Sequence, residues 1–383
     1  MRAHWVVISF LTAWLSPSLP EPAQGFPHDS LTFASVTAGA AHTCALTTGG
    51  RAYCWGSNAE GELGTGTRVD SPLPAPVGGN LLFLNLDAGV EFTCGVATSG
   101  VPYCWGRNST GALGNAATPR SFTPVPVTGG LLFRSVTAGN DHACGVADDG
   151  VAYCWGANSE GQLGTRDTLS SARPLPVAGA LRFRSVTAGD AHTCGITVDS
   201  LAYCWGSNRH GELGLGVRGP RLGPQPVAHH RRWGTLSAGA RHTCGTIADR
   251  HRAVLCWGDN FHEQINPRRS PSILGASILW IPTYASEPRG PVLVSAGRWH
   301  TCFVHRFASP SVSCRGADFD HQLGEFVLGT YVQVSAGDAH TCAVREDGAV
   351  FCWGLNAAGQ LGDGTRFSER RPVRVADRVS LGP

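Results

Sequence analysis

A pair of cysteines that recurs about every 50 residues constrains the fold of this 383-residue chain more than any other feature. The first members of the pairs are Cys44, Cys94, Cys144, Cys194, Cys244, Cys302 and Cys342, and the seven pairs use all 14 cysteines. Repeats of this length are typical of β-propellers, whose units cannot bury their own faces and stack around a ring. We therefore predict one body of seven repeats, although the length alone suggests two or three domains.

Each repeat contains four short segments with the pattern of strands. In the third repeat they include Leu131–Val136, His142–Ala147 and Val151–Trp155, and a proline-spaced segment such as Pro124–Val127 supplies the fourth strand of a repeat. Proline cannot donate to a central ladder, so we expect this segment at an outer edge. Four strands are the usual content of a propeller blade. The predicted fold class is all-β, a seven-bladed β-propeller of four-stranded antiparallel blades.

The two ends of the chain suggest how the ring closes. Pro372–Val375 is the proline-spaced segment that elsewhere precedes a run such as Leu131–Val136, whereas the first run, Leu31–Val36, has no such segment before it. We therefore predict that the N- and C-terminal strands join in one sheet and close the ring.

The cysteine spacing fits a hairpin in which the two cysteines of a repeat face each other. Placing Cys144 opposite Cys154 leaves Asp148–Gly150 as a three-residue loop, which favours a left-handed glycine at its last position. Directly opposed strand residues approach disulfide distance. We predict seven within-blade disulfides, namely Cys44–Cys54, Cys94–Cys104, Cys144–Cys154, Cys194–Cys204, Cys244–Cys256, Cys302–Cys314 and Cys342–Cys352. Each closes a short loop, so each contributes at most about 2–3 kcal/mol.

A metal site is the alternative use of these cysteines. A histidine stands two residues before the first cysteine in six repeats, and Phe92 replaces it in the second repeat. The histidines are His42, His142, His192, His242, His300 and His340. The spacing between the cysteines is not that of a zinc site, and near-identical sites in seven equivalent repeats favour a structural role. We expect disulfides, with no metal and no cofactor.

An aromatic pair recurs beside the second cysteine, as in Tyr53 and Trp55. An aromatic stripe of this kind is either a sugar-binding platform or part of the core. Because it is repeated in every regular unit, we predict that it packs between blades.

The N-terminus and the composition bear on the compartment. Residues 1–25 have the pattern of a signal peptide, with the apolar run Trp5–Leu15 and a small-residue site ending at Gly25. We expect residues 26–383 to form a single propeller domain that is secreted, periplasmic or at the cell surface, without membrane insertion. With 30 basic residues, all arginine, against 28 acidic residues, we expect no nucleic-acid binding.

The segment after the second cysteine carries a family resemblance. WGSNAEGELG (55–64), WGANSEGQLG (155–164) and WGLNAAGQLG (353–362) resemble the W-G-x-N-x-x-G-x-L-G motif of the regulator of chromosome condensation repeat family. The resemblance covers about residues 33–376 and implies a propeller scaffold. Its eukaryotic namesake is a nuclear guanine-nucleotide exchange factor that also binds chromatin. Other members are secreted, and the disulfide-stapled repeats resemble bacterial β-lactamase-inhibiting propellers in architecture.

Repeats five and six, about residues 245–335, depart from the pattern. The motif is interrupted after Asn260, an irregular insert follows, and Arg315 stands where a tryptophan is expected. Function often lies where a repeat protein breaks its own pattern. We therefore name as a candidate partner surface Trp280, Tyr284, Arg268, Arg269 and Arg315.

The function predicted from these features is an extracytoplasmic protein-interaction scaffold. We expect a monomeric propeller that presents variable loops, 65–71, 115–121, 165–171 and 215–221, to an unknown protein partner. One alternative is a guanine-nucleotide exchange factor or chromatin-associated regulator, as the resemblance implies. A further alternative is a carbohydrate-binding lectin or a hydrolase propeller. No catalytic motif such as G-x-S-x-G or H-E-x-x-H is present, so we expect no catalytic residues and no enzyme activity.

Overall fold

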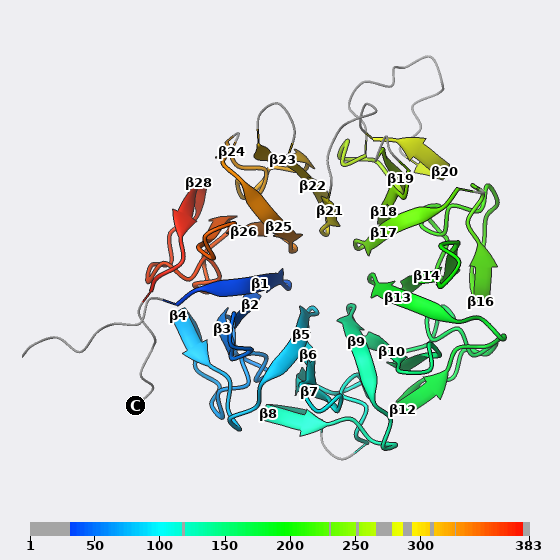
Figure 1. Cartoon of the computed structure of the whole chain (residues 1–383), viewed down its shortest axis with the longest axis horizontal. Coiled ribbons are helices and arrows are strands. Elements are labelled where there is room, and N and C mark those ends of the chain that lie inside the picture. The colour runs from blue at the N-terminus through cyan, green and yellow to red at the C-terminus, as the bar shows by residue number, and fades with distance from the viewer. Residues whose placement is uncertain are drawn as a thin grey trace, which may run out of the picture. The chain divides into compact units, whose positions relative to one another are not determined.

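The computed structural model describes residues 31–377, with the exception of 117–118, 230, 250–252, 266–277, 286–292, 307–309 and 326. The signal peptide predicted at residues 1–25 lies outside the described residues. All secondary-structure elements of the described part are β-strands, and they form seven antiparallel sheets of four strands around a central axis (Figure 1). The predicted seven-bladed β-propeller is confirmed.

Each blade is one contiguous stretch of chain whose strands follow each other from the axis outward. The innermost strands are β1 (Phe33–Ala38), β5 (Phe83–Ala88), β9 (Phe133–Ala138), β13 (Phe183–Ala188), β17 (Trp233–Ala238), β21 (Leu293–Ala296) and β25 (Tyr331–Ala336). The second strands are β2 (His42–Thr47), β6 (Phe92–Ala97), β10 (His142–Ala147), β14 (His192–Thr197), β18 (His242–Ile247), β22 (His300–His305) and β26 (His340–Arg345). The third strands are β3 (Ala52–Gly56), β7 (Pro102–Arg107), β11 (Ala152–Gly156), β15 (Ala202–Gly206), β19 (Val254–Asp259), β23 (Ser311–Gly316) and β27 (Val350–Gly354). The outer strands are β4 (Ser71–Pro76), β8 (Arg120–Pro126), β12 (Ser171–Pro176), β16 (Arg221–Pro226), β20 (Ile278–Tyr284), β24 (Val327–Leu328) and β28 (Glu369–Arg374).

The hairpin between the second and third strands has the predicted register. Cys144 lies opposite Cys154, and the amide of Ala147 donates to the carbonyl of Val151 at 2.9 Å. Gly150 closes the turn with a φ of 84°. Ser200 takes the same left-handed conformation in blade 4, with a φ of 71°, so the turn is kept where glycine is absent.

All seven predicted disulfides are present, one in each blade, and they use every cysteine of the chain. Each joins the second strand of a blade to the third. The bridges therefore fasten hairpins that are already hydrogen-bonded and do not join one blade to another.

The predicted closure of the ring is wrong. β28 pairs with β27 of its own blade, with Val373 opposite Cys352, and shares no sheet with β1. The short connection within a blade favours local pairing, because closing a longer loop costs more entropy. The ring closes instead across a seam between complete blades, where the amide of Phe33 donates to the carbonyl of Gly348 at 2.9 Å.

The hydrophobic core lies in the seams between blades. In one seam, Trp155 of blade 3 packs with Leu113 and with the disulfide of Cys94 and Cys104 in blade 2. The tryptophans beside the second cysteines are fully buried, so the predicted inter-blade role of the aromatic stripe is confirmed for them. Each blade thus packs one face of its sheet against the preceding blade and the other face against the following blade.

Candidate protein-binding face

The two faces of the ring carry different kinds of connection. One face, which we call the loop face, carries the turns between first and second strands, such as 39–41, and the long loops between third and fourth strands, such as 57–70. The other, the hairpin face, carries short turns such as 48–51. The tracts predicted to bind a partner all belong to the loop face: 65–71, 115–121 (of which 117–118 lie outside the described residues), 165–171 and 215–221.

A polar side chain holds the base of each long loop, and it is buried in five of the seven blades. The Oδ1 of Asn158 accepts the amide of Leu163 at 2.9 Å, and its Nδ2 donates to the carbonyls of Asp167 and Leu169, each at 3.1 Å. Irregular blades 5 and 6 keep the first bond, from Ile265 to Asn260 and from Leu323 to Asp318. The base of the loop is therefore conserved in geometry where the motif is broken.

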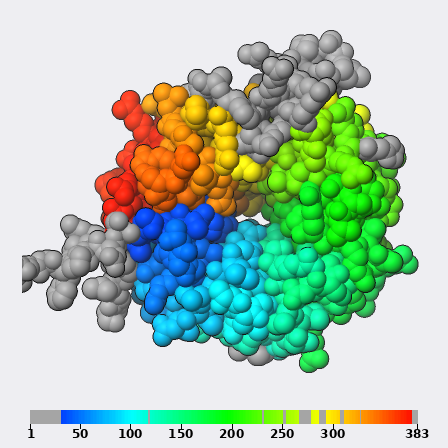
Figure 2. Space-filling model, in the orientation of Figure 1, coloured from blue at the N-terminus to red at the C-terminus, as the bar shows by residue number. Residues whose placement is uncertain are grey.

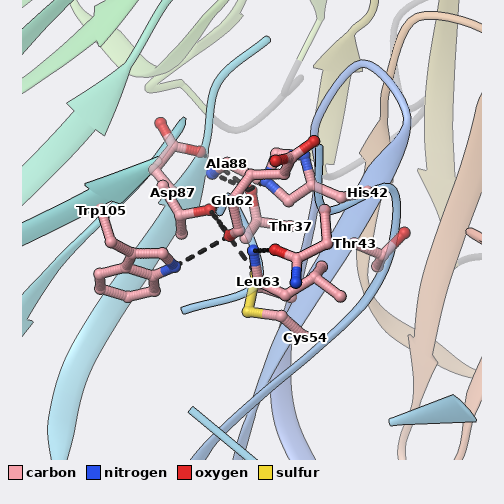
Figure 3. Close-up of a disulfide and its surroundings, with 12 residues drawn as sticks. Thr37, His42, Thr43, Cys54, Glu62, Leu63, Asp87, Ala88 and Trp105 are labelled. Atoms are coloured by element: carbon pink, nitrogen blue, oxygen red, sulfur yellow. Dashed lines mark hydrogen bonds between the residues drawn. A yellow bond between two sulfur atoms is a disulfide. The ribbon is translucent and has the colours of Figure 1, made fainter. Parts of the chain in front are cut away.

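In six of the seven blades, one backbone carbonyl ties the loop to the next blade. The carbonyl of Glu62 accepts the indole N–H of Trp105 at 2.9 Å (Figure 3). It also accepts the hydroxyl of Thr93 at 2.9 Å. The equivalent indole bonds join Trp55 to Gln360, Trp155 to Ala112, Trp205 to Gln162, Trp257 to Glu212 and Trp353 to Gln322. The outer half of a loop can thus vary in sequence without moving its anchored base.

Six buried histidines link the second strands of neighbouring blades. The Nε2 of His192 lies 2.9 Å from the Oγ1 of Thr243, which donates its own hydrogen to the carbonyl of Glu212. Thr243 must therefore accept from an Nε2–H, and the imidazole is the neutral Nε2–H tautomer. Burial lowers the pKa of His192 to about 3, because a proton on the buried Nδ1 finds no hydrogen-bond acceptor. Corresponding pairs are His42–Thr93, His142–Thr193, His242–Thr301, His300–Thr341 and His340–Thr43.

The seam between blades 2 and 3 replaces both members of this pair. Phe92 stands at the histidine position and Ala143 at the threonine position, and both are buried. A lone histidine or threonine would leave a buried polar group without its partner, which costs free energy. The joint replacement leaves neither group unpaired.

A polar cavity of about 150 Å³ lies on the axis and is lined by residues of all seven blades (Figure 2). The carboxylate of Asp87 in its wall accepts hydrogen bonds from the hydroxyls of Thr37 and Thr137 and from the amide of Ala138, at 2.8 to 3.0 Å. Burial raises the pKa of Asp87, and these hydrogen bonds oppose the rise. The cavity is smaller than the 300–1,000 Å³ of ordinary small-molecule sites, so it offers no room for a sizeable substrate.

The outer halves of the loops expose side chains that differ from blade to blade. Val69, Leu169 and Phe367 occupy one equivalent position, and Phe367 is 77% exposed. Arg209 forms an ion pair with Glu160 of the neighbouring loop. Exposed apolar side chains on an anchored backbone are what protein-binding surfaces present.

The structure describes three of the five residues named as the candidate partner surface, and their role as a surface stays a prediction. Trp280 and Tyr284 lie on β20, the outer edge of blade 5. The guanidinium of Arg218 lies over the ring of Trp280, 5.1 Å from its centroid. Arg315 lies on β23, over the ring of Phe303, and donates to the carbonyl of Ala285 at 2.8 Å. It thus supplies a donor at the position of the missing tryptophan. Arg268 and Arg269 lie outside the described residues.

Residues that the sequence analysis missed lie on the loop face of blades 5 and 6. Phe261 and Phe319 are exposed, and Trp299 and Arg241 stand in the neighbouring turns. Alignment of all seven repeats would have shown them, because the positions of the two phenylalanines hold alanine, serine or arginine in the other blades.

The histidine and cysteine positions do not form a metal centre in the part of the chain that the structure describes. The cysteine sulfurs are in disulfides, and the histidines face threonines. Within residues 31–377, outside the stated gaps, no group of three or more histidine, cysteine, aspartate or glutamate side chains is placed to hold a metal ion. Nor does this part contain a helix long and apolar enough to cross a membrane.

Comparison with known families gives a match over most of the chain. The family model of the RCC1-like domain matches residues 15–329, and two models of the regulator of chromosome condensation repeat match 331–360 and 347–380. The probable E3 ubiquitin-protein ligase HERC6 of Homo sapiens is 32% identical over 139 residues, which are 33% of this chain and 13% of the ligase. The regulator of chromosome condensation of Homo sapiens is 38% identical over 85 residues, 19% of this chain and 20% of that protein. The matches thus span a fifth or less of these relatives.

Solved structures share the propeller fold at low identity. Human WBSCR16 superposes with a TM-score of 0.74 at 19% identity, over 85% of this chain and 94% of its own. Prp20p of Saccharomyces cerevisiae, which was studied for its binding to Gsp1p and histones, has a TM-score of 0.59 at 20% identity. The match covers 89% of this chain and 76% of Prp20p. The CRINKLY WD40 ectodomain of the Arabidopsis thaliana receptor kinase ACR4 has a TM-score of 0.57 at 22% identity, over 91% and 100%. At these identities the likeness concerns the fold alone.

Proposed function

Because the chain belongs to the family of RCC1-like domains, we propose that it is an extracytoplasmic protein-interaction scaffold whose loop face binds a partner protein. One observation carries this proposal. The base of each loop is fixed by an asparagine or aspartate side chain and, in most blades, by a carbonyl bonded to the next blade, while its outer half exposes side chains that differ between blades. A rigid base under a variable surface is the arrangement that precise binding requires.

The disulfides support a location outside the cytosol. Seven bridges in one chain suggest an oxidising environment, since cytosolic thiols are kept reduced. We therefore propose that the protein is secreted, periplasmic or displayed at the cell surface, with residues 1–25 as its signal peptide. The ectodomain of ACR4 is a propeller of this fold on a receptor kinase, which is consistent with such a location.

A binding role also fits the chemistry of the molecule better than catalysis does. Propellers of this family are generally binding or exchange scaffolds, and Prp20p was studied for its binding to Gsp1p and histones. The central cavity is small. The near balance of acidic and basic residues does not favour binding of nucleic acid. The nuclear exchange-factor role is disfavoured because it would place seven disulfides in a reducing compartment.

Photo-crosslinking that distinguishes the two faces tests the proposal. A photoreactive phenylalanine analogue is placed at Ser159 or Ala357, which are exposed on the loop face, and at Thr48 or Thr98, which are exposed on the hairpin face. The oxidised protein is incubated with the extracytoplasmic fraction of its source and irradiated. We expect one protein adduct from the loop-face positions and none from the hairpin-face positions. Adducts that form equally from both faces would contradict the proposal.

A further inference from the structure

Two neighbouring blades carry an exposed phenylalanine at the same loop position. Phe261 of blade 5 and Phe319 of blade 6 follow the residue that anchors the loop, and they are 72% and 73% exposed. The equivalent residues of the other five blades are also exposed, but they are Ala59, Ser109, Ser159, Arg209 and Ala357. The repeat therefore needs no aromatic side chain here, and its two phenyl rings have no role in the core.

The turns beside these loops change in the same two blades. Trp299 and Arg241 occupy the turn position that is alanine in blades 1, 4 and 7. The guanidinium of Arg241 lies over the ring of Trp299, 5.1 Å from its centroid. Two further irregular residues thus lie against each other at the same seam.

His262 joins these side chains into one surface. Its ring centroid lies 5.1 Å from that of Phe261, 5.4 Å from that of Trp299 and 5.5 Å from that of Phe319, each in an edge-to-face arrangement. We call Phe261, His262, Trp299, Phe319 and Arg241 the aromatic patch. It is contiguous across the seam of blades 5 and 6.

Two described arginines, Arg241 and Arg298, lie over the ring of Trp299. Arg298 is paired with Asp338 at 2.9 Å. In the described part of the chain, Arg241 is exposed and makes no ion pair within 4 Å. A ligand that fits this surface places an apolar side chain against the phenyl rings and a carboxylate beside Arg241.

We propose that the aromatic patch is the docking site for a protein segment in which an apolar side chain lies next to an aspartate or glutamate. This proposal rests on the proposed function and assigns it a site and a partner chemistry. Aromatic side chains and arginine are the residues enriched at the energetic centres of protein interfaces. A sugar is a poorer fit, because sugar stacking needs an open aromatic face and the ring of Trp299 is covered by a guanidinium.

Sibling blades supply the substitutions that test the patch. Phe261→Ala and Phe319→Ala install the residue of blades 1 and 7, and Trp299→Ala and Arg241→Ala install the residue of blades 1, 4 and 7. Val198→Ala is the control, since this apolar side chain is 65% exposed in the hairpin-face turn between β14 and β15 of blade 4. Intact mass and the thermal unfolding temperature check that each variant keeps its disulfides and its fold.

The probe is a displayed library of random 12-residue peptides selected on the oxidised wild-type protein. We expect the selected peptides to pair an aromatic or aliphatic residue with Asp or Glu. Their Kd should rise at least tenfold for Phe261→Ala/Phe319→Ala and remain unchanged for Val198→Ala. Arg241→Ala should weaken only the peptides that contain the acidic residue, and added salt should remove that difference.

Several results would overturn the docking site. We call the combination of Phe261→Ala, Phe319→Ala, Trp299→Ala and Arg241→Ala the fourfold variant. The results are a selection that enriches no peptide, and peptides that bind the fourfold variant as tightly as the wild type. Self-association of the propeller that the fourfold variant abolishes, or glycan-array binding that depends on Trp299, would also overturn it. A partner that crosslinks to the loop face and still binds the fourfold variant would refute the patch and leave the proposed function standing. Absence of any loop-face adduct in the crosslinking experiment would refute the proposed function. The peptide selection tests only the aromatic patch.

Discussion

Acidification from pH 7.5 to 5.5 should strongly destabilise the folded propeller, because six buried histidines are neutral in it. Burial lowers the pKa of His42 to about 4 and of His142, His192, His242, His300 and His340 to about 3, from an ordinary value of 6.5. A lowered pKa in the folded state means that the unfolded state takes up more protons below pH 6.5. The stabilisation is therefore complete above pH 6.5 and is lost as the pH falls toward 3 to 4.

The size of the effect follows from the six sites. Between pH 7.5 and 5.5, protonation of one histidine in the unfolded chain alone favours unfolding by about 1.4 kcal/mol, so six histidines amount to about 8 kcal/mol. Domains are typically stable by only about 5–15 kcal/mol. The buried carboxyl groups Asp87, Asp190 and Asp338 have raised pKa values, and their contribution has the opposite sign as the pH falls through those values.

A matched variant isolates the histidine contribution. His192→Phe/Thr243→Ala reproduces the natural pair of Phe92 and Ala143 and removes one titrating group. The assay is urea unfolding of the oxidised protein at pH 7.5, 6.5 and 5.5 and constant ionic strength, followed by tryptophan fluorescence. We expect the loss of unfolding free energy between pH 7.5 and 5.5 to be smaller in the variant by about 1.4 kcal/mol. Equal losses in the variant and the wild type would refute the reasoning.

Other predictions concern single positions and the bridges. His192→Phe alone should destabilise the protein more than the double variant with Thr243→Ala, with a coupling of about 1 kcal/mol in a double-mutant cycle of urea unfolding; additive effects would argue against the pair. Gly189→Ala should cost at least about 2 kcal/mol in the same assay, because its Cβ would lie 2.3 Å from a neighbouring carbonyl oxygen, whereas Gly49→Ala, whose nearest atom is at 4.0 Å, should be nearly neutral. Asn158→Ala removes the side-chain hydrogen bonds to Leu163, Thr165, Asp167 and Leu169 and should cost about 2–3 kcal/mol and admit protease to loop 165–170 first; unchanged cleavage would count against the anchor. The oxidised protein should be about 14 Da lighter by intact mass than its reduced form, two hydrogens for each bridge; an unshifted mass would exclude the disulfides.

The sequence determined the blade architecture because two local rules agreed. The spacing of Cys144 and Cys154 and the position of Gly150 both specified the same hairpin register, and the structure has that register. The prolines of the outer strands likewise restricted those strands to an edge. Such signals are readable because they act within ten or so residues.

The closure of the ring could not be predicted in the same way. The proline-spaced strand precedes the next inner strand in sequence, but it pairs with the strand before it. Which strand β28 pairs with depends on the path of the long loop before it. Buried contacts such as those of Asn356 set that path, and strand order does not. Sequence proximity alone therefore misassigned β28.

The irregular blades show a similar limit for the candidate site. Arg315 stood out because it replaces a tryptophan, yet it donates to the carbonyl of Ala285 and packs on Phe303 within the fold. Phe261 and Phe319 differ from the residues at the same position of the other blades, and their exposure and their shared contact with His262 make them a candidate surface. A departure from the repeat indicates function only when the side chain has no structural task.

Hydrogen–deuterium exchange of the oxidised propeller with and without its purified partner tests the central claim most directly. We expect slower exchange on binding in loop-face peptides, such as those covering 57–70 and 157–170, and unchanged exchange in hairpin-face peptides covering 48–51 and 148–151. Protection confined to the hairpin face, or to the outer strands, would contradict the claim that this propeller binds through its anchored loops.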